Sequence, residues 1–273
     1  MKKNKSAFLS VPYIIFMLVF TLIPLCVVAY YALTEPGTGQ FTLANIKELS
    51  MYMPVLGQSV LYSLASALIC LVLGYPVAYY IAHRGKVMQK ILYMLVMLPM
   101  CMSFLLRTLA WVGLLQDTGI INNFLNWIGI GRIQLIRTPA AVVLGMVYNY
   151  LPYMILPLYA IIVKIDGRLI EAAEDLGCTP VQTFVKVVLP LSVPGILSGI
   201  TMVFVPAVST FYISQKLGGT DTVLIGDLIE RLFKQAANRN LGAALSLVLM
   251  ALVFICTGIM NRFGGEEEGG VVV

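Results

Sequence analysis

Few side chains in this sequence are of the kinds that perform covalent or metal-dependent chemistry. The one histidine, His83, stands beside Arg84 and Lys86 in a basic segment, where a solvated position is the simplest explanation. Four of the five cysteines lie in apolar stretches, and no pair has metal-ligand spacing. The phosphate-binding pattern Gly-x-x-x-x-Gly-Lys-Ser/Thr does not occur. We therefore expect no catalytic residue, no metal site, no cofactor and no nucleotide hydrolysis by this chain.

A patterned polar segment lies between the fourth and fifth long apolar stretches. Asp166 is a suitable N-cap for a helix that ends at Gly177, whose missing Cβ suits a left-handed C-terminal position. Thr179 and Gln182 have the spacing of a capping box for a second helix, which Pro190 is expected to end. A capped helical hairpin of this kind is suited to being bound by another protein. Its apolar residues recur at helical spacing: Leu169, Ala173, Leu176, Val181, Phe184, Val185 and Val188.

The same segment resembles the importer permeases of the ATP-binding-cassette (ABC) class. Those proteins carry a motif that begins with Glu-Ala-Ala. Three intervening residues separate it from a Gly, nine separate that Gly from an Ile, and one separates the Ile from Leu-Pro. This sequence has Glu171-Ala172-Ala173, Gly177, Val187 and Leu189-Pro190 at these positions, with Val in place of Ile. The resemblance implies that the hairpin is a coupling helix, which docks into a cytoplasmic ATPase subunit. It assigns the coupling role to Glu171, Ala172, Ala173, Gly177, Leu189 and Pro190.

The composition is that of a membrane protein. Hydrophobic residues make up 59% and charged residues 11% of the 273 residues, and the mean hydropathy is +0.90. A helix needs about 20 apolar residues to cross a bilayer core. Six segments satisfy this condition: residues 8–33, 54–82, 90–115, 139–163, 191–213 and 241–261. We expect an all-α integral membrane protein with six transmembrane helices and a cytoplasmic coupling hairpin, which is the type I ABC importer permease fold that the resemblance implies.

Basic residues near the ends of these segments predict the orientation. Lys and Arg gather at the N-terminus, near residues 83–90 and in residues 164–186, which are predicted to lie on one side of the membrane. The loop 214–240, which is predicted to lie on the opposite side, is an exception because it contains four Lys and Arg residues. Because cytoplasmic loops are enriched in Lys and Arg, we expect both termini in the cytoplasm and a multi-pass protein of the bacterial inner membrane. The expected parts are an N-terminal helix with the first extracytoplasmic loop (1–53), the permease domain (54–262) and a cytoplasmic tail (263–273).

Several other stretches are similar to the spermidine/putrescine importers. The resemblance implies a permease subunit that translocates polyamines by alternating access. Polyamines are flexible polycations, so their pathway should offer aromatic faces and acids. Arg107, which lies well inside a predicted span, is expected to snorkel toward the interface or to contact another helix. The candidate pathway residues are Trp111, Asp117, Tyr148, Asn149, Tyr153 and Tyr212.

The resemblance also implies the partners of the chain. These are a second, similar permease, two cytoplasmic ATPase subunits that bind ATP and magnesium, an extracytoplasmic substrate-binding protein, and membrane lipid. The net charge of +5 is modest and forms no basic stripe, which argues against nucleic acid.

Three alternatives remain open at this stage. The same kind of permease could carry a small anion, thiamine or iron. A secondary transporter or channel would be expected to have intramembrane coupling acids and often an inverted repeat, and neither is apparent in the sequence. An intramembrane enzyme would need a nucleophile with its base, or a metal site.

Overall fold

The computed structural model describes residues 12–13, 15–35, 39–219, 222–234 and 238–264. The regular elements of these residues are helices, and Thr34 and Phe41 form an isolated β-bridge. The chain divides into two compact units, which are Met1–Leu56 with Leu228–Leu252, and Gly57–Asp227 with Val253–Val273. An all-α membrane fold was predicted, and it is confirmed. The predicted division into 1–53, 54–262 and 263–273 stays a prediction.

The smaller unit contains the N-terminal helix and the loop that follows it. A π-helical turn, Leu18–Leu22, leads into α2 (Ile23–Ala32), and α3 (Ala44–Glu48) and a 3-10 turn (Leu49–Tyr52) come next. Two buried asparagines bind the backbone at the end of α2. Asn45 Nδ2 donates to the carbonyls of Ala32 at 3.1 Å and Thr34 at 3.0 Å, and Asn240 Nδ2 donates to the Thr34 carbonyl at 2.6 Å. These bonds fix the backbone at the point where the helix stops.

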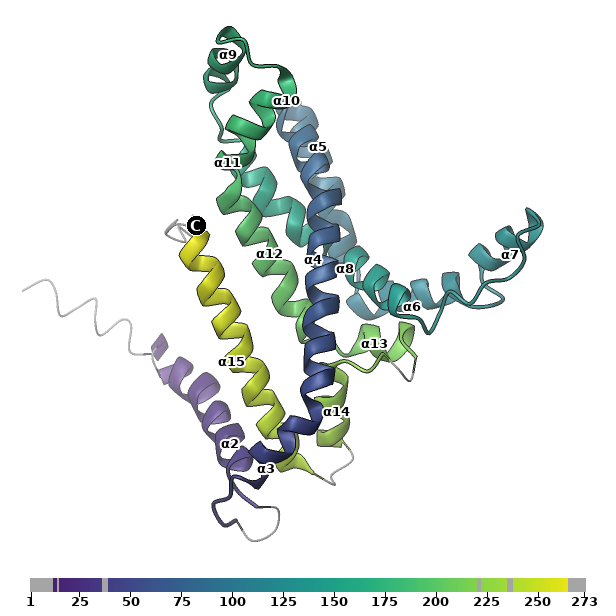
Figure 1. The fold of residues 1–273 in the computed structure, drawn as a ribbon, viewed down its shortest axis with the longest axis vertical. Helices are drawn as coiled ribbons and strands as arrows, with labels where there is room; N and C mark the ends of the chain where they lie inside the picture. The colour runs from purple at the N-terminus through teal and green to yellow at the C-terminus, as the bar shows by residue number, and fades with distance from the viewer. Residues whose placement is uncertain (1–11, 14, 36–38, 220–221, 235–237, 265–273) are drawn as a thin grey trace, which may run out of the picture. The chain divides into compact units, whose positions relative to one another are not determined.

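The larger unit is built around α8 (Pro139–Ile162). In the most apolar stretch of α8, 56% of the residues are buried. Most of α4 (Met53–Ala82) and all of α12 (Val193–Val208) belong to this unit, and α12 packs along α8. Gly199 makes this packing possible, because a Cβ there would lie 2.6 Å from the Met154 sulfur. The other helices of this unit are α5 (Lys86–Met97), α6 (Phe104–Leu115), α7 (Ile120–Trp127), α9 (Gly167–Asp175), α10 (Pro180–Thr183), α11 (Leu189–Leu191) and α13 (Tyr212–Leu217), shown in Figure 1.

Two further helices, α14 (Ile225–Lys234) and α15 (Arg239–Gly264), each contribute residues to both units. Within the described residues, five helices are long and apolar enough to cross a membrane, or six when one bent pair is counted as a span. The predicted spans 54–82, 139–163 and 241–261 are confirmed by α4, α8 and α15. The first predicted span, 8–33, is helical through Ala32, and its residues 8–11 lie outside the described residues.

The predicted span 90–115 is wrong as one continuous helix. After α5, residues Leu98–Cys101 form a 3-10 turn, and Met102 is extended with ψ 148°. Pro99 has no backbone N–H to continue the α-helical hydrogen bonds, so the chain tightens and then breaks before α6. In Figure 1, α6 leaves the direction of α5, and α7 follows it away from α8. The long apolar helical stretch of this region is Phe104–Trp127, which combines α6 and α7.

The predicted span 191–213 is also interrupted. The helical run Pro180–Leu191 meets α12 at a bend of 63°, and α12 already ends at Val208. The bend lies at Ser192, whose hydroxyl donates to the Leu189 carbonyl at 2.9 Å. Pro194 has no N–H to offer to the Pro190 carbonyl, and this favours the bend. The prediction that Pro190 ends the second hairpin helix was therefore wrong, because the helix ends at Leu191.

Candidate functional site

The hairpin between α8 and α12 forms as its sequence predicted. The Asp166 carboxylate caps α9 by accepting from the Arg168 backbone N–H at 3.0 Å. Gly177 then adopts φ +85°, a left-handed conformation that favours glycine. The capping box is complete, because Gln182 N–H donates to Thr179 Oγ1 at 3.4 Å and Thr179 N–H donates to Gln182 Oε1 at 3.0 Å. Local sequence thus determines the shape of the hairpin.

The apolar residues of the hairpin divide into a buried and an exposed set. Ala173 is 8% exposed and Val188 is 1% exposed, so these two pack inside the unit. Leu176 and Val181, on either side of the turn, are 87% and 72% exposed. Figure 1 shows α9 and α10 beyond the ends of α4 and α5. The turn therefore presents an apolar surface that no other described residue covers. We call Leu176 and Val181 the hairpin tip.

The six predicted coupling residues have unequal positions. Glu171, Ala172 and Gly177 are exposed on the first half of the hairpin. Ala173 is buried, Leu189 is partly buried, and Pro190 is exposed. Contact with another protein is open to Glu171, Ala172 and Gly177, whereas Ala173 and Leu189 contribute to the packing of the hairpin itself.

The second half of the hairpin is anchored on α4 through aromatic side chains. The Phe184 ring meets the rings of Tyr75 and Tyr79 edge to face, with centroid distances of 5.5 and 5.6 Å. The hydroxyls of Tyr75 and Ser192 lie 2.8 Å apart and share a hydrogen bond. These contacts hold the second half of the hairpin against α4. Helical spacing marked Phe184 as apolar in the sequence, but nothing there identified Tyr75 and Tyr79 as its partners.

A row of aromatic rings connects three helices of the larger unit. Tyr212 of α13 lies 6.3 Å from Phe104 of α6, Phe104 lies 6.4 Å from Tyr150 of α8, and Tyr150 lies 6.3 Å from Tyr153. We call these four residues the aromatic row. Tyr150 is buried, and its hydroxyl donates to the Pro206 carbonyl at 3.3 Å, whereas Tyr153 is 36% exposed. Both ends of the row, Tyr153 and Tyr212, were predicted from the sequence, whereas Phe104 and Tyr150 were not. The spacing of three residues between Tyr150 and Tyr153 was the available signal.

Three other predicted pathway residues have different surroundings. Trp111 and Tyr148 form an edge-to-face pair with centroids 5.4 Å apart. Asn149 is fully buried, and its Nδ2 donates to the Gly145 carbonyl at 2.9 Å, while its Oδ1 has no partner among the described residues. Its amide therefore serves its own helix.

Arg107 does not snorkel, so that part of the expectation was wrong, and its burial agrees with the other part, a position against a neighbouring helix. The residue is only 6% exposed, and its Nε and Nη1 have no hydrogen-bond partner within the described part of the chain. The break before α6 explains the difference, because α6 no longer continues the direction of α5 toward an interface. A buried guanidinium with unmet donors is costly.

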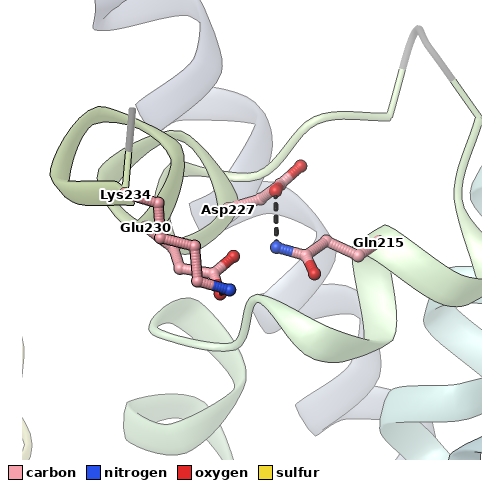
Figure 2. Close-up of polar contacts among 4 residues, drawn as sticks. All are labelled: Gln215, Asp227, Glu230 and Lys234. Atoms are coloured by element: carbon pink, nitrogen blue, oxygen red, sulfur yellow. Dashed lines mark hydrogen bonds and ion pairs between the residues drawn. The ribbon is translucent and has the colours of Figure 1, made fainter. Parts of the chain in front are cut away.

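Asp117 lies at a polar cavity of about 530 Å³ between the end of α6, the segment before α8, and α13. Arg137, Gln215 and Lys216 line the same cavity. Gln215 Nε2 donates to Asp227 Oδ1 at 2.9 Å, and Asp227 is 1% exposed, so a buried carboxylate orients an amide of the cavity (Figure 2). Figure 2 also shows the ion pair between Glu230 and Lys234, one turn apart on α14. Lys216 Nζ lies 5.8 Å above the Tyr212 ring, within the range of a cation–π contact.

Comparison with known proteins places this arrangement in one family. Residues 71–264 match the family described as binding-protein-dependent transport system inner membrane component. The spermidine/putrescine transport system permease protein PotB of Escherichia coli K12 is 39% identical over 213 residues, which cover 77% of this chain and 78% of that protein. PotB of Haemophilus influenzae is 38% identical over 249 residues, which cover 87% of each.

Solved structures show the same fold. A chain of a bacterial ABC transporter involved in the import of the acidic polysaccharide alginate superimposes with a TM-score of 0.81, at 20% identity and over 96% of both chains. A chain of the MetNI methionine ABC transporter gives a TM-score of 0.60 at 17% identity, over 80% of this chain and 96% of that one. The chain therefore has the fold of a type I ABC importer permease, and it belongs to the family of binding-protein-dependent transport system inner membrane components.

Proposed function

We propose that this chain is the permease subunit of an ATP-driven importer that carries the polyamines spermidine and putrescine. The observation that carries the proposal is the capped hairpin, which presents the coupling motif and an apolar tip at one end of the membrane-spanning unit. The cargo class is supported by 38–39% identity to spermidine/putrescine permeases over at least 77% of the chain.

The hairpin would couple ATP hydrolysis to the membrane helices. An ATPase subunit that closes on ATP would pull on the hairpin tip, and the contact of Phe184 with Tyr75 and Tyr79 would carry the displacement to α4. Alternating access follows when α4 and its neighbours open the pathway first to one side and then to the other. Two such ATPase subunits would bind the ATP and magnesium, and a second, similar permease would complete the pathway.

The direction of import requires the hairpin on the cytoplasmic side. Both termini would then lie in the cytoplasm of a bacterial cell, as the basic residues near the span ends favour. The opposite face, with the polar cavity, would receive cargo from an extracytoplasmic binding protein.

The aromatic row suits a flexible polycation. Aromatic faces attract ammonium groups through the ring quadrupole, and this attraction strengthens where water is excluded. Lys216 already holds its ammonium group above Tyr212, at one end of the row. Tyr153 at the other end and Tyr148 of the neighbouring pair are partly exposed, so their rings are the accessible ones. We propose that Tyr153 contacts cargo, with Tyr212, Tyr148 and Trp111 as further contacts.

Replacing Tyr153 by alanine is expected to lower initial polyamine uptake about 5- to 30-fold, because a desolvated cation–π contact contributes roughly 1–2 kcal/mol. Tyr153→Phe retains the ring and is expected to stay within about twofold of the wild type. Tyr80→Ala is the control, since Tyr80 is 53% exposed on α4 and its ring contacts Arg84. Equal uptake by Tyr153→Ala and the wild type, in transporters of equal ATPase activity, would remove Tyr153 from the pathway.

The decisive experiment is uptake of labelled spermidine and putrescine by proteoliposomes that hold the full assembly, with and without ATP. A variant with Glu171→Ala and Gly177→Pro is measured beside the wild type. ATP-dependent uptake that is lost in this variant supports both the cargo and the coupling role. Normal ATPase activity without uptake of either polyamine would exclude them as cargo. Uptake without ATP would contradict coupling.

A further inference from the structure

The connection between α4 and α5 carries a cluster of positive charge. Arg84, Lys86 and Lys90 lie within seven consecutive residues, and all three are exposed. Among the residues that the structure describes, no acidic side chain forms an ion pair with any of them. We call these three residues the basic turn. A cavity of about 210 Å³ is lined by residues that include His83 of this connection and Gly167 at the start of α9, so the basic turn lies at the hairpin end of the larger unit.

Hydrogen bonds fix the backbone that carries the basic turn. The Gln89 Nε2 amide of α5 donates to the Ala82 carbonyl at 2.9 Å and to the Arg84 carbonyl at 2.8 Å, which satisfies two carbonyls at the end of α4. The Tyr159 hydroxyl of α8 donates to Gln89 Oε1 at 3.4 Å. The Arg84 guanidinium carbon lies 4.1 Å from the centre of the Tyr80 ring, which keeps this side chain beside α4. The backbone positions of the cations are therefore set by the fold.

Exposed apolar rows on both helices lead to the basic turn. Leu73 and Val77 lie one turn apart on α4, and Val87, Ile91 and Leu95 follow one another at one-turn spacing on α5. Each of these side chains is exposed. In a chain that crosses a bilayer, exposed apolar rows of this kind face the lipid chains. The basic turn therefore stands where lipid chains end and lipid headgroups begin.

The charge of the basic turn identifies the chemistry of its ligand. Three cations repel a polyamine, so the basic turn is a poor place for the cargo. A phosphate accepts hydrogen bonds from Lys and Arg and balances their charge. A phospholipid headgroup and a free phosphate both offer this chemistry, and the adjoining apolar rows favour the phospholipid.

We propose that the basic turn binds the headgroup phosphate of an anionic phospholipid, whose acyl chains lie along the exposed apolar rows of α4 and α5. The inference goes beyond the proposed function and does not depend on the cargo. The bound lipid would hold the ends of α4 and α5 at the membrane surface, beside the hairpin.

The test measures lipid binding to the full transporter assembly in an uncharged detergent by native mass spectrometry. The assembly is titrated with phosphatidylglycerol and, separately, with phosphatidylcholine that has the same acyl chains. We expect the wild type to bind the first phosphatidylglycerol at least about tenfold more tightly than phosphatidylcholine. The variant Arg84→Gln/Lys86→Gln/Lys90→Gln is expected to lose at least about tenfold in phosphatidylglycerol affinity, because one Lys or Arg near an anionic lipid contributes roughly fivefold.

The matched control is Lys164→Gln/Arg168→Gln/Lys186→Gln, which removes three exposed cations from the hairpin and its base and leaves the basic turn intact. Its phosphatidylglycerol affinity should stay within about twofold of the wild type. Thermal midpoints and co-purification of the second permease establish that both triple variants are folded and assembled.

Four results would overturn the proposal. Equal phosphatidylglycerol affinities in the basic-turn variant and the wild type would remove the basic turn as the lipid site. An equal loss in the matched control would show a general effect of net charge. Displacement of phosphatidylglycerol by inorganic phosphate at the same concentration would show that the site holds a free phosphate. Loss of the second permease from the basic-turn variant alone would assign this surface to the contact between the permeases.

Discussion

Replacing both Leu176 and Val181 by aspartate is expected to reduce ATP-driven uptake at least 100-fold while the permease remains folded. The two side chains are 87% and 72% exposed at the hairpin tip, so the substitutions remove no internal packing. Burying each of them in a partner's groove would contribute roughly 1.5–3 kcal/mol, and burying two carboxylates there instead costs more. Two such losses exceed the roughly 2.8 kcal/mol that correspond to a 100-fold change in affinity. Co-purification of the ATPase subunits and uptake in proteoliposomes measure the effect.

Arg168→Asp is the control for the introduced charge, because Arg168 is an exposed residue of the same hairpin away from its tip. It is expected to retain uptake within about twofold. The thermal midpoint of the double variant should match the wild type. Full ATPase binding by the double variant would show that the hairpin tip is not where the ATPase docks.

Replacing Gly226 by alanine is expected to destabilise the larger unit strongly. A Cβ at this position would lie 2.6 Å from two backbone oxygens, those of Ser209 and Thr210. The neighbouring Ile225 N–H donates to Ser59 Oγ of α4 at 2.8 Å, so the start of α14 cannot easily move away. Overpacking against backbone costs about 3 kcal/mol, because the backbone must shift. The thermal midpoint in detergent should fall by about 10 °C.

Gly258→Ala is the matched control for Gly226→Ala. Gly258 lies in α15, and a Cβ there would meet no atom within 4 Å. Alanine inside a helix is more favourable than glycine by roughly 0.5–1 kcal/mol, so this variant should keep or slightly raise the midpoint. Equal midpoints for Gly226→Ala and Gly258→Ala would mean that the junction between α12 and α14 is looser than the structure shows.

Local sequence patterns determined the elements that depend on near neighbours. Asp166, Gly177 and Thr179 fixed the hairpin because caps and left-handed glycines act within a few residues. Long apolar runs predicted the bounds of α4, α8 and α15 to within a few residues, because a bilayer imposes a minimum length on any spanning helix. The spacing of the coupling motif gave the family, which the comparisons then confirmed.

Apolar composition could not locate the breaks within spans. A bilayer selects for hydrophobicity, and the segments 90–115 and 191–213 satisfy that condition whether or not the helix is continuous. Prolines occur within continuous α4 and α8 as well as near the breaks at Met102 and Ser192. Whether a proline bends or ends a helix depends on which neighbours satisfy the freed carbonyl, and those neighbours are distant in the sequence.

The sequence by itself determined that this chain is an all-α membrane permease with a capped hairpin, because hydrophobic length and capping are local properties. Only the tertiary structure decided which polar and aromatic residues meet. It joined Tyr153 to Tyr212 through Phe104 and Tyr150, buried Arg107, and placed Asp117 beside Arg137 and Lys216. These contacts depend on how α6, α8 and α13 pack, and packing is set by side chains far apart in the chain.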